Sequence, residues 1–206
     1  MRVNIINKLH SKTNRAYLPR MVDDKVKCMK IARQFDEAFF DGDRRYGYGG
    51  YHYDGRYKSV AKDLIDRYEL TDKSRVMDFG CAKGFLLKEI KDLCGCEVYG
   101  YDVSKYALDN AVIPIKRPDP HDSFDLILSL GTLHNLKLPE LKVMLRYFQN
   151  GAKNSYITVD SYRNIRELFN LQCWTLTCEQ FFQPKEWEFL FEEWGYKGDW
   201  EFLFFK

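Results

Sequence analysis

The chain has 206 residues and a formal net charge of +2, and 45% of its residues are hydrophobic, 30% charged and 16% aromatic. This length suits one domain that buries a substantial core, and the composition is ordinary for a soluble globular protein. The small net charge does not favour DNA, RNA or a membrane surface as a partner. No apolar run approaches the roughly 18–20 residues that span a bilayer. We therefore expect one globular domain over residues 1–206.

The N-terminus and the cysteines indicate the cellular compartment. The first twenty residues are polar and carry basic residues throughout, unlike a secretory signal peptide. Six cysteines in a chain of this size do not suggest a disulfide framework. Cys94 and Cys96 form the only close pair and lack the second pair of a zinc site, so we expect no bound metal. These features favour a cytoplasmic protein with reduced thiols.

Residues 1–40 predict a helical N-terminal extension. An apolar stripe with the i, i+3, i+4, i+7 spacing of a helix is formed by Cys28, Ile31, Ala32 and Phe35. Residues 1–34 also contain nine Lys or Arg residues. A solvated face on a capping helix is the simplest interpretation, and a contact with RNA or an acidic substrate is the alternative.

Residues 41–57 contain five glycines, five tyrosines and three arginines. The glycines disfavour regular structure, while the aromatic and basic side chains suit ligand binding. We expect this segment to be a lid over a ligand site, with an aromatic loop packed on the sheet as the alternative. A helix follows, with one apolar face made by Ala61, Leu64, Ile65 and Tyr68.

Residues 76–87, VMDFGCAKGFLL, predict a strand end, a glycine turn and the start of a helix. The turn has the pattern Asp-x-Gly-x-x-x-Gly, from Asp78 to Gly84, instead of the Gly-x-Gly-x-x-Gly of dinucleotide sites. An acid before the first glycine suits a ligand with an ammonium group and suits a pyrophosphate poorly. A second strand, residues 97–101, leads to Asp102, whose carboxylate can accept hydrogen bonds from two ribose hydroxyls.

The rest of the chain continues to alternate between helical and extended patterns. Strands are predicted at residues 124–130, 155–160 and 200–205. Four helices are predicted as well. Two of them have an apolar face or an N-cap near the glycine turn, at Leu86, Ile90 and Leu93 and at Ser104. The other two have apolar stripes, one at Leu141, Met144, Leu145 and Phe148, and one between Pro184 and Gly195 at Trp187, Leu190, Phe191 and Trp194. Residues 111–123 contain three prolines and leave room only for a short strand near Val112–Ile115. Residues 170–182 are neither cleanly helical nor cleanly alternating.

The stretch from Asp78 to Gly84, together with Asp102, resembles the cofactor site of class I S-adenosylmethionine (SAM)-dependent methyltransferases. Ala82 stands where many members have a third glycine, and we expect one extra methyl group to be tolerated. The tracts RRYGYGGYHYDGRY, DFGCAKGFLL, SLGTLHNL, WTLTCEQFF and EWGYKGD resemble a subgroup of small bacterial methyltransferases. The resemblance runs from about residue 20 to the C-terminus, and the short 111–123 segment is its main departure.

The resemblance implies an α/β fold with a Rossmann-like sheet and helices on both faces. Its strands should be mostly parallel, with an antiparallel strand at the C-terminus and a shortened third-strand region. Within one domain, residues 1–57 would form the helical cap and lid, residues 58–160 the SAM-binding core, and residues 161–206 the acceptor side. Relatives usually place an adenine-contacting acid after the third strand, and neither Asp119 nor Asp122 can be assigned to that role.

The resemblance also implies which residues bind SAM. The cofactor-binding candidates are Asp78, Gly80, Cys81, Ala82, Gly84, Phe85, Asp102, Val103, Gly131, Thr132, Tyr51 and Arg56. Tyr51 and Arg56 belong to the lid, where Arg56 would pair with the carboxylate of the methionine moiety. Gly131 and Thr132 follow the strand 124–130, so they should face the ligand at the carboxyl edge of the sheet.

His134 is the best candidate for a general base, because it follows that strand and its ordinary pKa lies near working pH. Asn135 would orient His134 or the acceptor. The alternative to a catalytic His134 is a hydrogen-bonded structural histidine. Weaker candidates are Tyr51, His52, Tyr53 and Glu179. Alignment of the reactants alone can supply several orders of magnitude in rate, so a base is optional.

We expect methyl transfer from SAM to an oxygen or nitrogen of a small polar metabolite. The subgroup commonly occurs with genes for surface-polysaccharide or secondary-metabolite building blocks, which makes saccharides and secondary-metabolite precursors the candidate acceptors. The basic N-terminal helix leaves RNA methylation as an alternative. A second alternative, suggested by Ala82 and the short 111–123 segment, is a SAM-binding protein without transferase activity. The glycine spacing disfavours a nicotinamide-dependent dehydrogenase.

Overall fold

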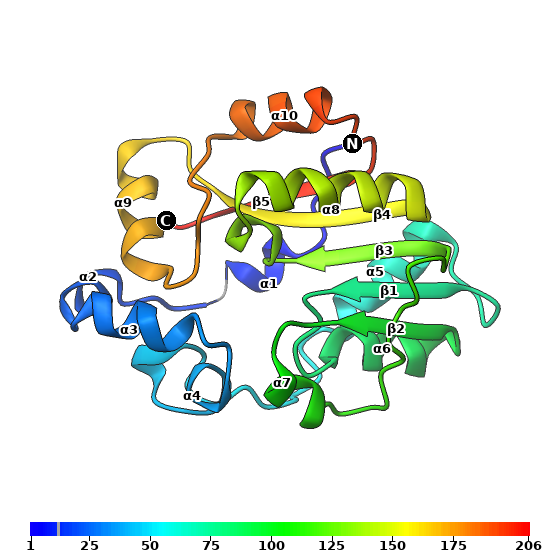
Figure 1. The fold of residues 1–206 in the computed structure, drawn as a ribbon, viewed down its shortest axis with the longest axis horizontal. Coiled ribbons are helices and arrows are strands. Elements are labelled where there is room, and N and C mark those ends of the chain that lie inside the picture. Colours follow the sequence, from blue (N-terminus) through cyan, green and yellow to red (C-terminus); the bar gives the residue numbers. More distant parts are fainter. Residues whose placement is uncertain (12) are drawn as a thin grey trace.

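A five-stranded parallel sheet lies between two layers of helices in the computed structural model, which describes residues 1–11 and 13–206 (Figure 1). The strands are β1 (Arg75–Phe79), β2 (Glu97–Tyr101), β3 (Phe124–Leu130), β4 (Ala152–Ser161) and β5 (Asp199–Phe204). Their order across the sheet is β2-β1-β3-β4-β5. Because helices cover both faces, the strands carry apolar side chains at consecutive positions. Val76 packs in one buried cluster, whereas its neighbour Met77 packs in the other.

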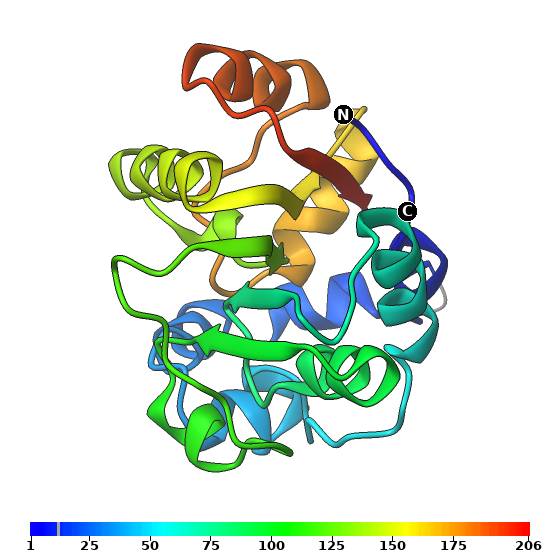
Figure 2. The same ribbon diagram turned by 90° about the vertical axis from the view of Figure 1, so that its right-hand side faces the viewer.

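Figure 2 shows the two helical layers on opposite faces of the sheet. One layer contains α1 (Asn7–His10), α5 (Lys58–Tyr68) and α6 (Phe85–Cys94), and the other contains α8 (Leu138–Gly151) and α10 (Pro184–Glu193). The remaining helical elements are α2 (Tyr17–Val22), α3 (Lys25–Ala32), α4 (Glu37–Phe40), η1 (Arg44–Tyr46), α7 (Lys105–Asp109), η2 (Leu133–Asn135) and α9 (Ile165–Trp174). In the part of the chain that the structure describes, none of the helices combines the length and hydrophobicity needed to cross a bilayer.

Most predicted core elements are present. The apolar stripe of residues 61–68 lies on α5, and Ser104 caps α7 by accepting a hydrogen bond from the Ala107 N–H. In α6, Leu86 and Ile90 are buried as expected, but Leu93 is exposed. The helix α9 was not predicted, because the apolar residues of 170–182 continue beyond its end and obscure its periodicity.

The predicted antiparallel C-terminal strand is wrong, since β5 pairs with β4 in parallel, from Tyr156 with Asp199 to Ser161 with Phe204. The reason lies in the connection. After β4 the chain passes through α9, near the carboxyl ends of the strands, and then through α10, which packs on the sheet beside α8 (Figure 1). This return brings the chain back to the amino end of the sheet, so β5 must run in the same direction as β4.

The shortened 111–123 segment does not form a third strand. Its only ladder contact is an isolated parallel bridge between Tyr99 and Lys116, where the Gly100 N–H donates to the Lys116 carbonyl at 3.0 Å. The predicted strand near Val112–Ile115 is therefore reduced to one bridge just beyond its end. Ile115 still packs against the adjoining core cluster.

The described residues of the N-terminal region, 1–11 and 13–40, contain the four short helices α1 to α4. Residues before α1 run beside β5, where the Val3 N–H donates to the Trp200 carbonyl at 2.9 Å. The helices α2, α3 and α4 then lie at the carboxyl ends of β1, β2 and β3, as does α9 (Figure 1). Of the predicted helical stripe, Cys28 and Ala32 are buried in α3, whereas Phe35 follows the helix in a left-handed conformation with φ 51°.

Candidate active site

A cavity of about 1300 Å³ opens at the carboxyl ends of the strands. Parallel α/β sheets bind their ligands at this edge, because the loops that follow the strands converge there. The predicted site residues that line it are Tyr51, Arg56, Asp78, Gly80, Cys81, Ala82, Phe85, Asp102, Val103, Gly131, Thr132, His134 and Asn135. Gly84 does not line it, and the weaker candidates are described below.

The glycine turn after β1 is held in a shape that its residue types dictate. Gly80 has φ 84°, and a Cβ there would come within 2.1 Å of the Thr132 hydroxyl oxygen. Gly84 has φ 74°, and its Cβ would come within 2.8 Å of Ile115. Its role is therefore close packing beside the helix start. Ala82 adopts φ 48°, a left-handed conformation that costs a residue with a Cβ about 1–2 kcal/mol.

Asp78 places a carboxylate without a partner at the floor of the cavity. The side chain is buried, and among the described residues its Oδ1 has no hydrogen-bond partner. Burial raises the pKa of Asp78 to about 7, with a further contribution from the negative charge of Asp102. A buried acid of this kind fits a cationic group of a ligand, which would restore its charge.

Asp102, directly after β2, is the second acid at this end of the cavity. Its Oδ2 accepts a hydrogen bond from the Ala82 N–H, and its Oδ1 accepts one from the Ser104 N–H, both at 2.8 Å. Burial raises the pKa of Asp102, and these two hydrogen bonds partly offset that effect. Each oxygen keeps a free lone pair, so the carboxylate can still accept hydrogen bonds from two hydroxyl groups. We call Asp78, Asp102 and the turn between residues 78 and 84, where the sequence predicts a cofactor site, the cofactor end.

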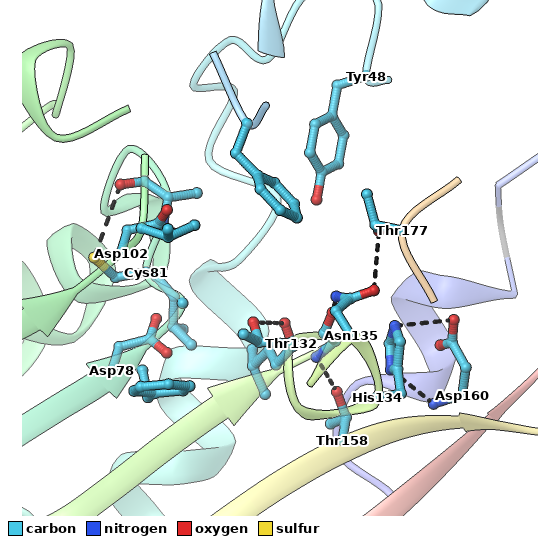
Figure 3. A pocket seen from close by; sticks show the side chains of 18 of the residues that line it. Tyr48, Asp78, Cys81, Asp102, Thr132, His134, Asn135, Thr158, Asp160 and Thr177 are labelled. Atoms are coloured by element: carbon cyan, nitrogen blue, oxygen red, sulfur yellow. Dashed lines mark hydrogen bonds and ion pairs between the residues drawn. The ribbon is translucent and has the colours of Figure 1, made fainter. Parts of the chain in front are cut away.

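His134 and Asp160 form a buried pair in another part of the cavity (Figure 3). The Asp160 N–H donates to His134 Nδ1 at 3.2 Å, and His134 Nε2 lies 3.3 Å from Asp160 Oδ2. Because Nδ1 accepts a hydrogen bond, the ring proton of a neutral His134 belongs on Nε2, facing the carboxylate. Burial raises the pKa of Asp160, while His134 and Arg15 lower it.

Asn135 lies between this pair and the cofactor end in Figure 3. Its Oδ1 accepts a hydrogen bond from the Thr177 hydroxyl at 2.9 Å, and its Nδ2 donates to the Gly131 carbonyl at 3.3 Å. The amide is thus held by the turn after β3 and by the segment after α9. Its placement fits a side chain that orients a neighbouring ligand.

A family model described as a methyltransferase domain matches residues 53–199, which is more than half of the 206 residues. The chain belongs to this methyltransferase family. A solved structure with the same fold is that of a SAM-dependent methyltransferase from Archaeoglobus fulgidus. Its sequence is 20% identical, the TM-score is 0.51, and the match covers 67% of this chain and 68% of that chain. The YcgJ protein of Bacillus subtilis has 18% identity, TM-score 0.50, and coverage of 65% and 66%. The match thus spans about two thirds of each solved chain, and no curated protein matches this sequence.

The predicted lid segment of this methyltransferase, residues 41–57, is tied to the cofactor end by a partly buried anchor made of Lys83, Asp41 and Tyr106. Lys83 Nζ lies 2.5 Å from Asp41 Oδ2, which also accepts a hydrogen bond from the Tyr106 hydroxyl at 2.7 Å. Lys83 Nζ donates in addition to the Tyr51 carbonyl at 3.1 Å. The ring of Tyr51 then stacks on Phe85, with the centroids 4.5 Å apart.

The anchor also perturbs the acid at its centre. Burial raises the pKa of Asp41, but hydrogen bonds from Lys83, Tyr106 and the Tyr51 backbone N–H together lower it to about 2. Asp41 therefore stays ionised at neutral pH and holds the lid segment against the glycine turn.

Other predicted residues are less clearly directed at a ligand. The Arg56 guanidinium forms a bidentate pair with Asp54, from Nε to Oδ1 at 2.8 Å and from Nη2 to Oδ2 at 2.6 Å. His52 lines the cavity, whereas Tyr53 and Glu179 do not. Tyr53 donates to Glu89 at 2.6 Å, and Glu179 pairs with Arg33.

The two acids of the 111–123 segment, Asp119 and Asp122, lie in different places relative to the cavity. Asp119 lines the methyltransferase cavity, whereas Asp122 pairs with Arg75, whose Nη2 lies 2.5 Å from Oδ1. Asp119 is thus the acid of this segment that a ligand in the cavity could reach.

Several polar residues that line the cavity were not predicted as site residues from the sequence: Asp160, His10, Arg15, Arg20 and Arg44. Asp160 directly follows the apolar run of its strand, and the same rule that selected the turn after β3 could have selected it. The sequence places Arg15 and Arg20 only in a basic N-terminal region, and Arg44 only in the predicted lid. No spacing along the chain shows that they meet.

Proposed function

We propose that this methyltransferase uses SAM to methylate an oxygen or nitrogen of a small polar metabolite bound in the same cavity. The observation that carries the proposal is Asp78, whose buried Oδ1 has no partner among the described residues. SAM has an ammonium group, a ribose diol and a sulfonium centre, and an ionised Asp78 suits the ammonium. The free lone pairs of Asp102 suit the diol.

When bound, SAM supplies a methyl group on sulfur that a nucleophile can displace. The chain's own residues would align the reactants and exclude water. Tyr51 and Phe85 would close one wall with their stacked rings, while Gly131 and Thr132 form the edge after β3. Val103, next to Asp102 and largely exposed, would cover the nucleoside part.

Methylation of a hydroxyl or amine also requires that a proton leave the acceptor. We assign its uptake to the pair of His134 and Asp160, with the carboxylate as the proton acceptor. His134 would position that carboxylate, because its Nδ1 is occupied by a backbone N–H and its Nε2 faces Asp160. Burial raises the pKa of Asp160, which makes it a stronger base than an exposed aspartate.

The lining of the cavity supports a small acceptor over RNA. Arg15 and Arg20 of the basic N-terminal region lie in the cavity wall. Lys25, from the same region, donates to the carbonyls of Cys173 and Thr175 at 2.7 and 2.6 Å. These cations are thus partly committed to the interior and do not form one continuous outer face for a phosphate backbone.

Calorimetry with S-adenosylhomocysteine tests the cofactor assignment directly. We expect one molecule to bind per chain, and Asp102→Asn to weaken binding by about 1–3 kcal/mol, the usual effect of losing a charged hydrogen-bond acceptor. Asp109→Asn is the matched control, because Asp109 lies on the exposed side of α7 in a surface pair with Lys105. Absence of binding to the wild-type chain would refute the proposal.

The acceptor class can be tested with SAM carrying a labelled methyl group. The label should pass to the small-metabolite fraction of a cell extract and not to its RNA. Labelling of RNA alone would replace the small-acceptor proposal with the RNA alternative.

A further inference from the structure

We propose that the acceptor carries an anionic group, a carboxylate or a phosphate, and that Arg15, Arg20 and Arg44 bind it beside Trp174. This inference rests on the proposed function, since it names the acceptor class of that same cavity. We call these three residues the arginine cluster. Each lines the cavity, and each comes from a different segment of the N-terminal region.

The three guanidinium groups gather on one indole ring. Their Cζ atoms lie 5.5, 4.7 and 4.9 Å from the ring centroid of Trp174, in the order Arg15, Arg20 and Arg44. Trp174 is the last residue of α9. A flat aromatic face attracts guanidinium groups, so the indole holds three like charges close together. The mutual repulsion of these charges is relieved if an anion binds among them.

The arginine cluster forms no direct ion pair in the part of the chain that the structure describes. Among the described residues, no carboxylate oxygen lies within 4.0 Å of any of its three guanidinium groups, whereas Arg67 and Arg163 each form such an ion pair. The hydrogen bonds of the cluster go instead to carbonyl oxygens. Arg20 Nε, for example, donates to the Trp174 carbonyl at 2.8 Å.

Carbonyl oxygens leave the donors of the cluster only partly used. Arg15 Nη1 donates to the carbonyls of His10 and Thr13 at 3.2 and 3.1 Å, while its buried Nε has no partner among the described residues. Burial, together with the nearby charge of Arg44, lowers the pKa of Arg20 to about 10. The cluster is therefore cationic at neutral pH and retains unused N–H donors.

The position of the cluster relates it to the acceptor and not to the cofactor end. Arg15 is close enough to Asp160 to lower the pKa of that carboxyl group. Trp174 lies three residues before Thr177, which holds Asn135 in Figure 3. In that view, Asp78 and Asp102 lie on the opposite side of Asn135 from His134 and Asp160. An anion at the cluster would thus be bound near the proposed proton acceptor.

Guanidinium groups suit both carboxylates and phosphates, because their planar forks can donate two parallel hydrogen bonds. The acceptor class is therefore a small metabolite with one of these groups, such as a sugar acid or a phosphorylated compound. The competing occupant is the carboxylate of SAM itself, and the experiment must separate the two.

The test is a calorimetric titration. The full chain is first saturated with S-adenosylhomocysteine, and inorganic phosphate or malonate is then added while the heat of binding is measured. We expect at least one of these anions to bind, and Arg44→Gln to weaken that binding by about 10- to 100-fold, the equivalent of one charge-assisted hydrogen bond. The side chain of Arg44 is exposed, and among the described residues it donates only to the Gly47 carbonyl, so the variant should fold. Arg166→Gln is the control, since Arg166 is exposed on α9 and does not line the cavity.

The outcomes separate the proposals. Preferential binding of phosphate or of malonate identifies the anionic group. If neither anion binds the complex, or if Arg44→Gln leaves binding unchanged, the inference is overturned. If Arg44→Gln instead weakens S-adenosylhomocysteine but not methylthioadenosine, which lacks the amino acid moiety, the cluster binds the cofactor carboxylate and the inference is also overturned. If S-adenosylhomocysteine does not bind the wild-type chain, the proposed function itself fails.

Discussion

The two ends of the cavity are built in different ways. The cofactor end comes from one stretch of chain, in which β1, a glycine turn, α6 and β2 place Asp78 and Asp102 beside each other. The opposite end combines side chains from the N-terminal helices, the turn after β3, the end of β4 and the end of α9. One end is acidic, and the other carries the arginine cluster.

This contrast suggests how the fold divides its tasks. A contiguous unit can keep its geometry while the rest of the molecule changes, which suits a donor that many enzymes share. An end assembled from distant segments changes with every altered helix or loop, and under the proposed function it would determine the acceptor. Variants at the two ends should therefore affect different measurements.

The largest effect is expected at the end of the cavity that holds His134 and Asp160, where we propose that the acceptor binds. Asp160→Asn should reduce turnover by about 10²- to 10⁴-fold, the usual contribution of a general base, while the affinity for S-adenosylhomocysteine stays unchanged. The backbone N–H of residue 160 still donates to His134 Nδ1, so the imidazole keeps its position. Single-turnover methyl transfer measures the change, with Asp125→Asn as control because Asp125 pairs with the exposed Lys153. Full activity of the Asp160→Asn variant would show that alignment alone drives the reaction.

At the cofactor end, Asp78→Asn should have opposite effects on binding and on stability. The affinity for S-adenosylhomocysteine should fall by about 10- to 100-fold, because the ammonium loses its ionic partner. The free protein should become more stable at pH 8. The folded pKa of about 7 exceeds the ordinary 3.8, so the stability that Asp78 contributes below pH 4 is lost as the pH rises toward 7. Urea unfolding at pH 4 and pH 8 measures this, with exposed Asp63→Asn as control.

The same pKa predicts a proton released on binding. At pH 6 most Asp78 groups in the free protein hold a proton, and an ammonium ligand would expel it. The enthalpy of S-adenosylhomocysteine binding should therefore depend on the ionisation enthalpy of the buffer, and this dependence should disappear in Asp78→Asn. A wild-type enthalpy that is equal in all buffers would contradict the assignment.

A smaller effect is expected at the anchor that ties the lid segment to the cofactor end. Lys83→Met removes the buried partner of Asp41 and should reduce the free energy of unfolding by about 1–3 kcal/mol. The loss should be smaller than for a fully buried ion pair, because Asp41 keeps two other hydrogen bonds. Thermal unfolding measures the loss, and faster tryptic cleavage at Arg44 and Arg45 would show that the lid segment has loosened. Lys105→Met, which breaks an exposed pair, should change neither.

The smallest effect is expected at Ala82. Ala82→Gly relieves a left-handed residue but gives the unfolded chain more freedom, so the net gain in stability should be about 1 kcal/mol or less. The affinity for S-adenosylhomocysteine should not change, because the Ala82 N–H that donates to Asp102 is retained. A large gain in affinity would show that the alanine methyl group obstructs the cofactor end.

The same division explains how far the sequence could be interpreted. The cofactor end was predictable because strand, turn, helix and acid follow one another at fixed spacing. The direction of β5 was not, since it depends on how α9 and α10 return the chain. The arginine cluster was not predictable either, because Arg15 and Arg44 come together over Trp174, which lies far along the chain. His134 was found at the cavity, but its engagement with Asp160 through both ring nitrogens depends on the pairing of β3 with β4.

The ion pair of Lys83 and Asp41 within the anchor also has an evolutionary consequence. Loss of either residue alone leaves a largely buried charge without its partner, which is more costly than replacing both together. We therefore expect positions 41 and 83 to covary among relatives, with Tyr106 following Asp41 because their side chains are hydrogen-bonded. Relatives that keep the glycine turn but lack this pair should hold their lid segments differently. Covariation at these positions would thus sort the family by how the cavity is closed.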